Sequence, residues 1–341
     1  TGHEIEGLQW LLELFTKLAT GYFYLSRYQS EDALQILYAI PPTQRETPWV
    51  LAQIAKAFYQ RHKYTEAEET FSKIKKLAPS RMEDMEVYST VLWHLKRSID
   101  LSYLAHTLVD ADRYSPQAWC ALGNSFSLQR EHNQAIKCFQ RATQLDPQFA
   151  YAWTLQGLEH IENEEFDKAQ WSYRKAVGCD PRHYQAWYGL AQSFERLSKY
   201  EVAEKHYRSA LAINPRNAIL MVCIGAVLEK QHRPRPALRA YTSAVEADPR
   251  SKMARFKRAK VLVDLKKIPE AIVDLEALKD MAPDEALVHY QLARCYKMRR
   301  DRAGAIKHFT MAGNLDPKGM QHVKGHLEAL DDDDYDDDDE F

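Results

Sequence analysis

The stretch SPQAWCALGNSFSLQREHNQAIKCFQRATQLDP, from Ser115 to Pro147, decides the fold. Its first half carries apolar and small residues at spacings of three and four, which is the spacing of one helix face. These residues are Trp119, Leu122, Gly123 and Phe126. Its second half repeats the pattern with Ala135, Phe139 and Ala142 and then reaches a proline, which cannot continue a helix. The stretch therefore predicts two helices that pack closely at their small residues.

The same pattern returns every 34 residues along the chain. Six prolines share this spacing: Pro147, Pro181, Pro215, Pro249, Pro283 and Pro317. Twelve residues before each proline stands an alanine: Ala135, Ala169, Ala203, Ala237, Ala271 and Ala305. Eight residues before it stands a large side chain: Phe139, Tyr173, Tyr207, Tyr241, Leu275 and Phe309. A fixed period of this length indicates a stacked array of helix pairs, because one pair cannot bury its apolar face alone.

The columns resemble the tetratricopeptide repeat, which implies an all-α fold, a superhelix or α-solenoid of antiparallel helix pairs. Extended upstream, the register predicts nine 34-residue repeats over residues 14–319. One of them, 82–115, is degenerate, because Leu101 stands where the alanine belongs. We expect residues 1–13 to be the end of a preceding repeat, residues 320–330 to be a capping helix, and residues 331–341 to be an acidic disordered tail. The first residue is not a methionine, so we expect the chain to be part of a longer protein.

Charge is distributed unevenly along the chain. The net charge is −2, but the tail DDDDYDDDDEF carries nine acidic groups between Asp331 and Glu340. Without these nine, 39 acidic residues face 46 basic ones, so the body has a charge of about +7. So many like charges with so few apolar side chains predict a solvated tail that improves solubility or screens the body.

Composition and motifs exclude several classes of protein. No run of about 18 apolar residues is present, so no membrane span is expected. Five cysteines without a C-x-x-C pair are typical of reduced thiols, and we expect no disulfide framework. No phosphate loop, dinucleotide fingerprint or G-x-S-x-G motif occurs, so we expect no enzyme activity and no cofactor. His322 and His326 have the spacing of a helical ligand pair but lack an accompanying carboxylate motif, so no metal site is predicted.

In a helix-pair solenoid, the residues of the inner wall do not take part in packing the helices together. The first helices line that wall at positions 2, 5, 9 and 12 of each unit. Over residues 116–230 these columns offer amides, tyrosines, apolar groups and carboxylates, which suit an extended peptide with a free carboxylate and a guanidinium. The candidate peptide-binding residues are Asn124, Tyr151, Leu158, Glu162, Tyr188, Gln192 and Glu195. Farther along, Lys260, Arg294 and Lys297 make the wall basic. Interspersed acidic residues and the acidic tail argue against a nucleic-acid partner.

Several strings resemble one repeat family more closely. They are the opening stretch, MEVYSTVLWHL at 85–95, PRHYQAWYGL at 181–190 and NLDPKG at 314–319. Together they are similar to the C-terminal repeat array of the Cdc27-type (Nuc2-type) subunit of the anaphase-promoting complex. The resemblance implies a nuclear (and cytoplasmic) scaffold of a ubiquitin ligase in the cell cycle, with other complex subunits as partners. It also implies that co-activator tails ending in Ile-Arg bind in the groove, and that repeats absent here form a homodimer.

On this resemblance, individual residues acquire roles. Asn124 is expected to donate to the tail's carboxylate or backbone, and Leu158 and Tyr188 to form an apolar wall. Glu195 or Glu162 is expected to pair with the arginine, and Gln192 is a weaker candidate. Two other functions stay open: a chaperone adaptor that clamps a different C-terminal peptide, and a repeat arm attached to an enzyme.

Overall fold

The computed structural model describes residues 2–316 and 324–325. Within these residues it contains 19 helices and no strand, which confirms the predicted all-α fold. The chain divides into two compact units, Thr1–Pro215 (unit 1) and Arg216–Phe341 (unit 2). The unit 1 helices are α1 (Gly2–Ser26), α2 (Ser30–Tyr38), α3 (Pro42–Arg45), α4 (Pro48–Gln60), α5 (Tyr64–Leu77), α6 (Met85–His94), α7 (Ser98–Ala111), α8 (Pro116–Leu128), α9 (His132–Leu145), α10 (Ala150–Glu162), α11 (Phe166–Cys179), α12 (Tyr184–Arg196) and α13 (Tyr200–Ile213). The unit 2 helices are α14 (Ala218–Lys230), α15 (Pro234–Ala247), α16 (Lys252–Asp264), α17 (Ile268–Met281), α18 (Ala286–Met298) and α19 (Arg302–Leu315).

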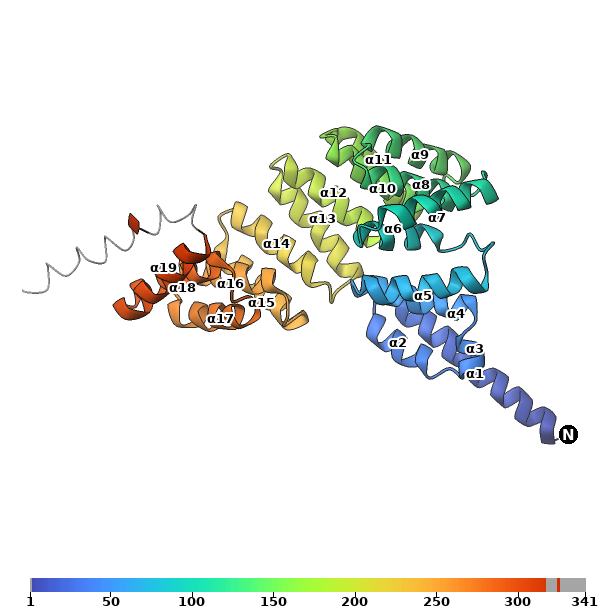
Figure 1. Cartoon of the computed structure of the whole chain (residues 1–341), viewed down its shortest axis with the longest axis horizontal. Coiled ribbons are helices and arrows are strands. Elements are labelled where there is room, and N and C mark those ends of the chain that lie inside the picture. The colour runs from blue at the N-terminus through green and yellow to red at the C-terminus, as the bar shows by residue number, and fades with distance from the viewer. Residues whose placement is uncertain (1, 317–323, 326–341) are drawn as a thin grey trace, which may run out of the picture. The chain divides into compact units, whose positions relative to one another are not determined.

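Helix pairs are the building block of both units. In unit 1, α8 packs on α9, α10 on α11 and α12 on α13, while α8, α10 and α12 also touch in succession (Figure 1). In unit 2, α14 packs on α15, α16 on α17 and α18 on α19. Each second helix also contacts the first helix of the following pair within its unit, so the pairs stack side by side. We call the leading helix of each pair the first helix and the other the second helix.

The turn between the two helices of a pair has one geometry throughout. Nine non-glycine residues with φ between 58° and 63° occupy this turn, and they are 34 residues apart. They are Tyr28, His62, Lys96, Arg130, Glu164, Ser198, His232, Lys266 and Arg300. Left-handed backbone costs an ordinary residue about 1–2 kcal/mol, so the surrounding packing must hold each turn in place. Lys96 lies in the degenerate segment, which therefore keeps the same turn although it lacks the alanine column.

Close packing of an aromatic ring against small residues joins the two helices of a pair. The rings of Phe139, Tyr173 and Tyr241 are fully buried, and each lies against a glycine of a first helix. A Cβ atom added to Gly123 would lie 2.4 Å from Cε1 of Phe139. One added to Gly189 would lie 2.2 Å from Cζ of Tyr173. Any larger side chain at these positions would have to displace a buried ring.

The degenerate segment 82–115 forms two helices, α6 and α7, and packs through larger side chains. Leu101 takes the alanine position and is fully buried in a cluster with Phe71, Met85 and Leu92. Asp84, immediately before α6, adds a further residue with positive φ, at 66°. The segment therefore contributes a first helix to the stack, but the backbone leading into that helix is left-handed at Asp84.

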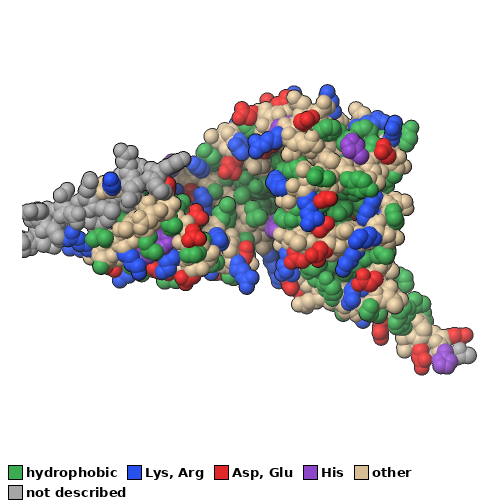
Figure 2. Space-filling model, in the orientation of Figure 1, with side chains coloured by type: hydrophobic (Ala, Val, Ile, Leu, Met, Phe, Trp, Pro, Cys, Tyr) green, Lys and Arg blue, Asp and Glu red, His purple; other side chains and the backbone are tan. Residues whose placement is uncertain are grey.

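The two ends of the chain bear on the expected boundaries. Helix α1 is continuous through residues 2–26, so the expected boundary between residues 13 and 14 is not marked by a break. The first part of α1 exposes Ile5, Leu8, Leu12 and Phe15. Figure 2 shows green hydrophobic side chains along the part of α1 that extends away from the other helices. Of the expected capping helix 320–330, only Lys324 and Gly325 are described, and the acidic segment 331–341 lies outside the described residues. The division into nine units remains our proposal.

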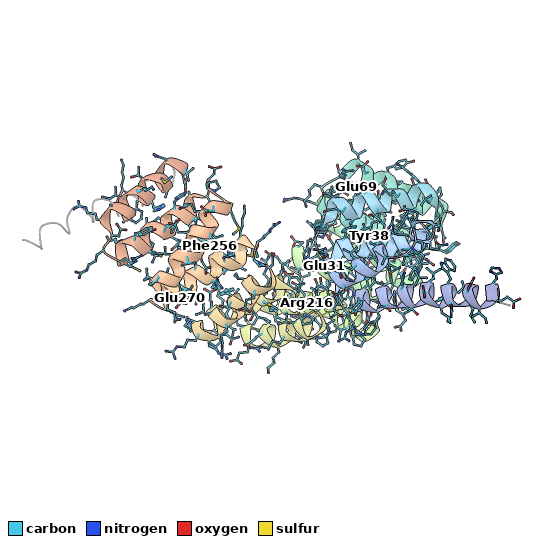
Figure 3. All side chains as sticks on the ribbon, turned by 90° about the horizontal axis from the view of Figure 1, so that it is seen from below. Glu31, Tyr38, Glu69, Arg216, Phe256 and Glu270 are labelled. Carbon is cyan, nitrogen blue, oxygen red and sulfur yellow. The ribbon has the colours of Figure 1, made fainter. Side chains whose placement is uncertain are left out.

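Exposed ion pairs join two helices in unit 1 and lie at the start of one helix in unit 2. Figure 3 shows Glu31 of α2, which forms an ion pair with Arg61 at the end of α4; Arg61 Nη2 lies 2.6 Å from Glu31 Oε2. It also shows Phe256 of α16 and Glu270 of α17, the latter paired with Lys267 at 3.0 Å. Exposed pairs of this kind contribute at most about 1 kcal/mol each, so the packed rings dominate stability.

We predict that Gly123→Ala destabilises unit 1 by about 1–3 kcal/mol, because the new methyl group collides with the buried Phe139 ring. Gly7→Ala is the matched control, because no atom lies within 4 Å of its added Cβ. That substitution should raise stability by up to about 1 kcal/mol through helix propensity. Urea unfolding followed by circular dichroism measures both changes. Equal effects of the two substitutions would contradict the close approach.

Candidate peptide-binding groove

Three consecutive first helices share one hydrogen-bonded wall. The amide nitrogen of Asn124 (α8) donates to the hydroxyls of Ser89 and Thr90 (α6), at 2.9 and 3.0 Å. The Thr90 hydroxyl also lies 2.6 Å from the hydroxyl of Tyr151 (α10). Asn124 is only 4% exposed. We call this network, with Glu86 at its base, the α6–α10 wall.

Glu86 stands beneath this network at the start of α6. The Ser89 and Thr90 hydroxyls lie 2.7 and 3.1 Å from its backbone carbonyl. Among the described residues, its side-chain Oε2 is buried and has no hydrogen-bond partner. Burial, and after it the neighbouring charge of Asp84, raises the pKa of Glu86 to about 7. An acid with this pKa is partly protonated near neutral pH.

Asp84 already holds the two nearby cations. Its carboxylate pairs with Lys56 Nζ at 2.9 Å and with Arg81 Nη2 at 3.0 Å. Lys56 comes from α4 and Arg81 from the loop before α6. The same Arg81 nitrogen lies 2.9 Å from Glu83. The local positive charge is therefore shared by two other carboxylates and does not form an ion pair with Glu86.

Tyrosines from distant parts of unit 1 crowd beside the wall. Tyr59 (α4) shares a hydrogen bond with Tyr151, and burial raises the pKa of both phenols. Tyr28 lies edge-on to Tyr184 (α12), with ring centres 4.9 Å apart. Arg182 donates to the Ser26 carbonyl at 3.1 Å, so the α1–α2 turn meets the loop before α12. Side chains of α4, α10 and α12 thus pack beside the wall together with the α1–α2 turn.

Leu158 and Glu162 line a separate small cavity of about 280 Å³. The other lining residues are Trp93, Lys96, Ser127, Leu128, Arg130, His132 and Glu159. Trp93 donates to the Ser127 hydroxyl at 3.2 Å, and His132 lies 2.7 Å from the Glu159 carboxylate. Leu158 is partly buried and Glu162 is exposed. This cavity connects α6, α8 and α10 at the end of the first helices opposite Glu86.

The remaining candidates gather on α12. The Tyr207 hydroxyl donates to Glu195 at 2.6 Å, and the Tyr188 ring lies 5.7 Å from the Tyr207 ring. Gln192 is partly buried on the same helix. The structure therefore brings together Asn124 with Tyr151, and Leu158 with Glu162. Tyr188 and Glu195 meet only around the buried Tyr207, so the seven residues form three patches on successive helices.

Our sequence analysis missed Glu86 and Thr90 of the wall, and Lys56 and Tyr59 of α4, which lie beside it. A signal for them was present, because they occupy positions 5, 9, 9 and 12 of their own 34-residue units. The predicted columns covered residues 116–230, whereas α6, which completes the wall, lies in the degenerate unit before them.

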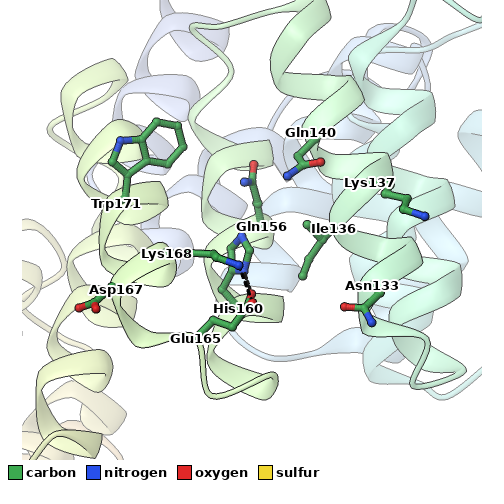
Figure 4. A pocket seen from close by; sticks show the side chains of 10 residues that line it. All are labelled: Asn133, Ile136, Lys137, Gln140, Gln156, His160, Glu165, Asp167, Lys168 and Trp171. Atoms are coloured by element: carbon green, nitrogen blue, oxygen red, sulfur yellow. Dashed lines mark hydrogen bonds and ion pairs between the residues drawn. The ribbon is translucent and has the colours of Figure 1, made fainter.

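A larger cavity of about 840 Å³ lies between the second helices α9 and α11 (Figure 4). Gln156 and His160 of α10 form its floor, with Trp171 on one side and Ile136 on the other. Its charged groups bind one another, since Glu165 accepts from Lys168 and lies 2.6 Å from His160. This surface is formed mainly by second helices, away from the columns predicted to bind a peptide.

Metal-binding groups and membrane-spanning helices are both absent from the described residues. No group of three metal-binding side chains occurs in that part of the chain, while His322 and His326 lie outside it. Among the helices that the structure describes, none is long and apolar enough to cross a bilayer.

The helix pairs and their small-residue columns define a tetratricopeptide-repeat protein. Models of the tetratricopeptide repeat match residues 116–149, 154–218 and 225–286. Among solved structures, the chain is similar to the anaphase-promoting-complex hetero-tetramer Cut9–Hcn1, with a TM-score of 0.66 and 18% identity. That match covers 88% of this chain and 58% of the other, and it supports the fold.

Curated relatives specify the family. Protein bimA of Emericella nidulans is 57% identical over 98% of this chain and 42% of its own length. Anaphase-promoting complex subunit 3 of Schizosaccharomyces pombe is 46% identical over 94% of this chain and 48% of its own length. The chain belongs to the Cdc27-type family of repeat proteins that includes these relatives, which confirms the resemblance seen in the sequence. It spans less than half the length of either relative.

We predict that Glu86→Gln stabilises the chain more at pH 8 than at pH 5. The folded pKa near 7 exceeds the unfolded value near 4.5, so the native state loses stability as the pH rises between these values. Glutamine does not titrate and removes this loss. The difference in thermal midpoint between variant and wild type should therefore grow with pH. A difference independent of pH would show that Glu86 is not perturbed by burial.

Proposed function

We propose that this chain is the peptide-receiving repeat array of a non-catalytic scaffold subunit of the anaphase-promoting complex. In this proposal it acts in the nucleus, with other subunits of that complex as partners, and repeats outside this chain form a homodimer. The names of the relatives support the complex, and the repeat columns, which predict helix pairs over residues 14–319, support a scaffold rather than an enzyme.

We propose further that the first-helix columns of unit 1 bind co-activator tails ending in Ile-Arg. The observation that carries this proposal is the α6–α10 wall, where amide, hydroxyl and phenol groups of three helices converge. A peptide's terminal carboxylate requires such donors, because buried charge without hydrogen bonds is costly. Leu158 and Tyr188 supply apolar surface on the next two first helices, and Glu162, Gln192 and Glu195 supply polar contacts farther along.

Within this proposal, Asn124 acts through the groups that it holds. Both of its amide hydrogens point to the Ser89 and Thr90 hydroxyls, which fixes those hydroxyls beside Tyr151. The Thr90 hydroxyl already donates to the Glu86 carbonyl and the Tyr151 hydroxyl is bonded to Thr90, so a carboxylate that binds here must take a hydrogen from one of these bonds. Asn124 can also donate directly if a ligand displaces one of the two hydroxyls.

We predict that Asn124→Ala weakens binding of an Ile-Arg-terminated peptide by about tenfold or more. Losing a hydrogen bond to a charged group costs about 1.5–3 kcal/mol, which corresponds to that change in affinity. Fluorescence anisotropy with a labelled peptide measures it. Asn163→Ala is the control, because Asn163 is an amide in the α10–α11 turn that bonds Asn133 at 3.1 Å and lies away from the wall.

Three further peptides complete the test. A scrambled tail and a C-terminally amidated tail should bind weakly, because each loses a group that the wall receives. A peptide ending in Glu-Glu-Val-Asp represents the chaperone-adaptor function. Equal binding of all four peptides, or tighter binding of the acidic one, would reject the proposed ligand.

A further inference from the structure

Glu86 is set apart from the other carboxylates of the first helices. Glu195 accepts from the Tyr207 hydroxyl at 2.6 Å, and Glu159 lies 2.7 Å from His132. Glu162 is exposed, so water solvates it. The Oε2 atom of Glu86 has neither water-accessible surface nor a partner among the described residues. This carboxylate alone among the four lacks a compensating group for a buried oxygen.

The surroundings of Glu86 do not supply that group. Lys56 and Arg81 are oriented toward Asp84, at 2.9 and 3.0 Å. Cys120 from α8 and Tyr151 from α10 face Glu86 from the other side, and both are close enough for its charge to affect them. Neither can neutralise a carboxylate. A buried polar atom without a partner costs about 1–3 kcal/mol, and more if it is charged, so natural sites of this kind need an explanation.

The position of Glu86 in the first-helix columns offers an explanation for its unpartnered oxygen. Glu86 occupies the same column as Cys120, at position 5 of its unit, and its backbone carbonyl accepts from the Ser89 hydroxyl that Asn124 holds. The residue as a whole is partly exposed but Oε2 is buried, so a ligand reaches this oxygen only by displacing the side chains that cover it. A ligand that touches Thr90 and Tyr151 is therefore adjacent to an unsatisfied carboxyl oxygen.

We infer that Glu86 is the acceptor for a cationic side chain, a guanidinium or an ammonium, of the peptide bound in this groove. This inference rests on the proposed function and assigns to Glu86 the role that the sequence suggested for Glu162 or Glu195. A guanidinium fits better than an ammonium, because its planar fork can donate two hydrogen bonds to one carboxylate. A pair formed in this crowded position is screened less by solvent than one formed with exposed Glu162.

Binding of a cation here is coupled to release of a proton. The pKa of free Glu86 is raised to about 7, chiefly by burial, and an adjacent cation favours the ionised form. Below pH 7 the acid must therefore lose its proton before it can pair. Affinity should rise by up to about tenfold per pH unit as the pH increases toward 7, and level off above it.

The other groups that face Glu86 do not account for such a slope. Burial raises the pKa of the Cys120 thiol and of the Tyr151 phenol, so both stay neutral between pH 6 and 8. Asp84, Lys56 and Arg81 are bound to one another in ion pairs. His94, at the end of α6, has a pKa lowered to about 4 by burial and is neutral in the same range.

A double-mutant cycle tests the inference with the full 341-residue chain. The peptides end in Ile-Arg, Ile-Lys or Ile-citrulline, where citrulline keeps the shape of arginine without its charge. They are titrated against wild type and Glu86→Gln by calorimetry at pH 6, 7 and 8. Glu164→Gln is the matched control, because Glu164 is an exposed carboxylate in the α10–α11 turn. Glu162→Gln and Glu195→Gln test the competing carboxylates.

We expect Glu86→Gln to lower the affinity for Ile-Arg at least tenfold at pH 8 and to leave Ile-citrulline within about threefold. The wild-type pH slope should vanish in this variant and persist in Glu164→Gln. If Ile-Arg binds wild type, three results would overturn the inference but not the proposed function. They are an equal loss of affinity for Ile-Arg and Ile-citrulline in Glu86→Gln, an unchanged pH slope in that variant, and a charge-dependent loss of affinity in Glu162→Gln or Glu195→Gln instead. Failure of Ile-Arg to bind wild type at any of these pH values would overturn both this inference and the proposed function.

Discussion

The close approach of paired helices at small residues is the constraint on which this structure depends. A methyl group at Gly189 would come within 2.2 Å of the Tyr173 ring, and one at Gly123 within 2.4 Å of the Phe139 ring. In each pair, one face of both helices therefore packs around the buried ring. The second helices use another face to contact the next first helix. What remains of each first helix is the inner column set, whose composition the packing does not dictate.

That freedom explains how polar groups come to line a protein held together by apolar rings. Ser89, Thr90, Asn124 and Tyr151 lie on three helices whose cores are ordinary, yet they form a continuous hydrogen-bonded wall. The network stabilises the wall only because every buried member but one finds a partner. Glu86 is that member, and burial raises the pKa of its carboxyl group, which disfavours the charged form there. An unsatisfied group in an otherwise satisfied network indicates a ligand more strongly than any of its satisfied neighbours.

The sequence was sufficient to predict the helix pairs, because glycine, alanine, aromatic and proline columns at a 34-residue period admit one kind of packing. It did not reveal how Leu101 would replace an alanine, since that depends on the cluster of large side chains around Phe71. Nor could a period predict that Tyr28 meets Tyr184, because this contact depends on the curvature of unit 1 over more than 150 residues. The same applies to Asn124, whose column was identified but whose hydroxyl partners lie in the degenerate unit.

The most direct measurement is a structure of this chain bound to a peptide ending in Ile-Arg. Our account predicts that the peptide terminus lies against α6, α8 and α10, with its carboxylate near the Thr90 and Tyr151 hydroxyls and its guanidinium within hydrogen-bonding distance of Glu86. A peptide seated instead in the cavity between α9 and α11, with the α6–α10 wall unchanged and empty, would contradict it.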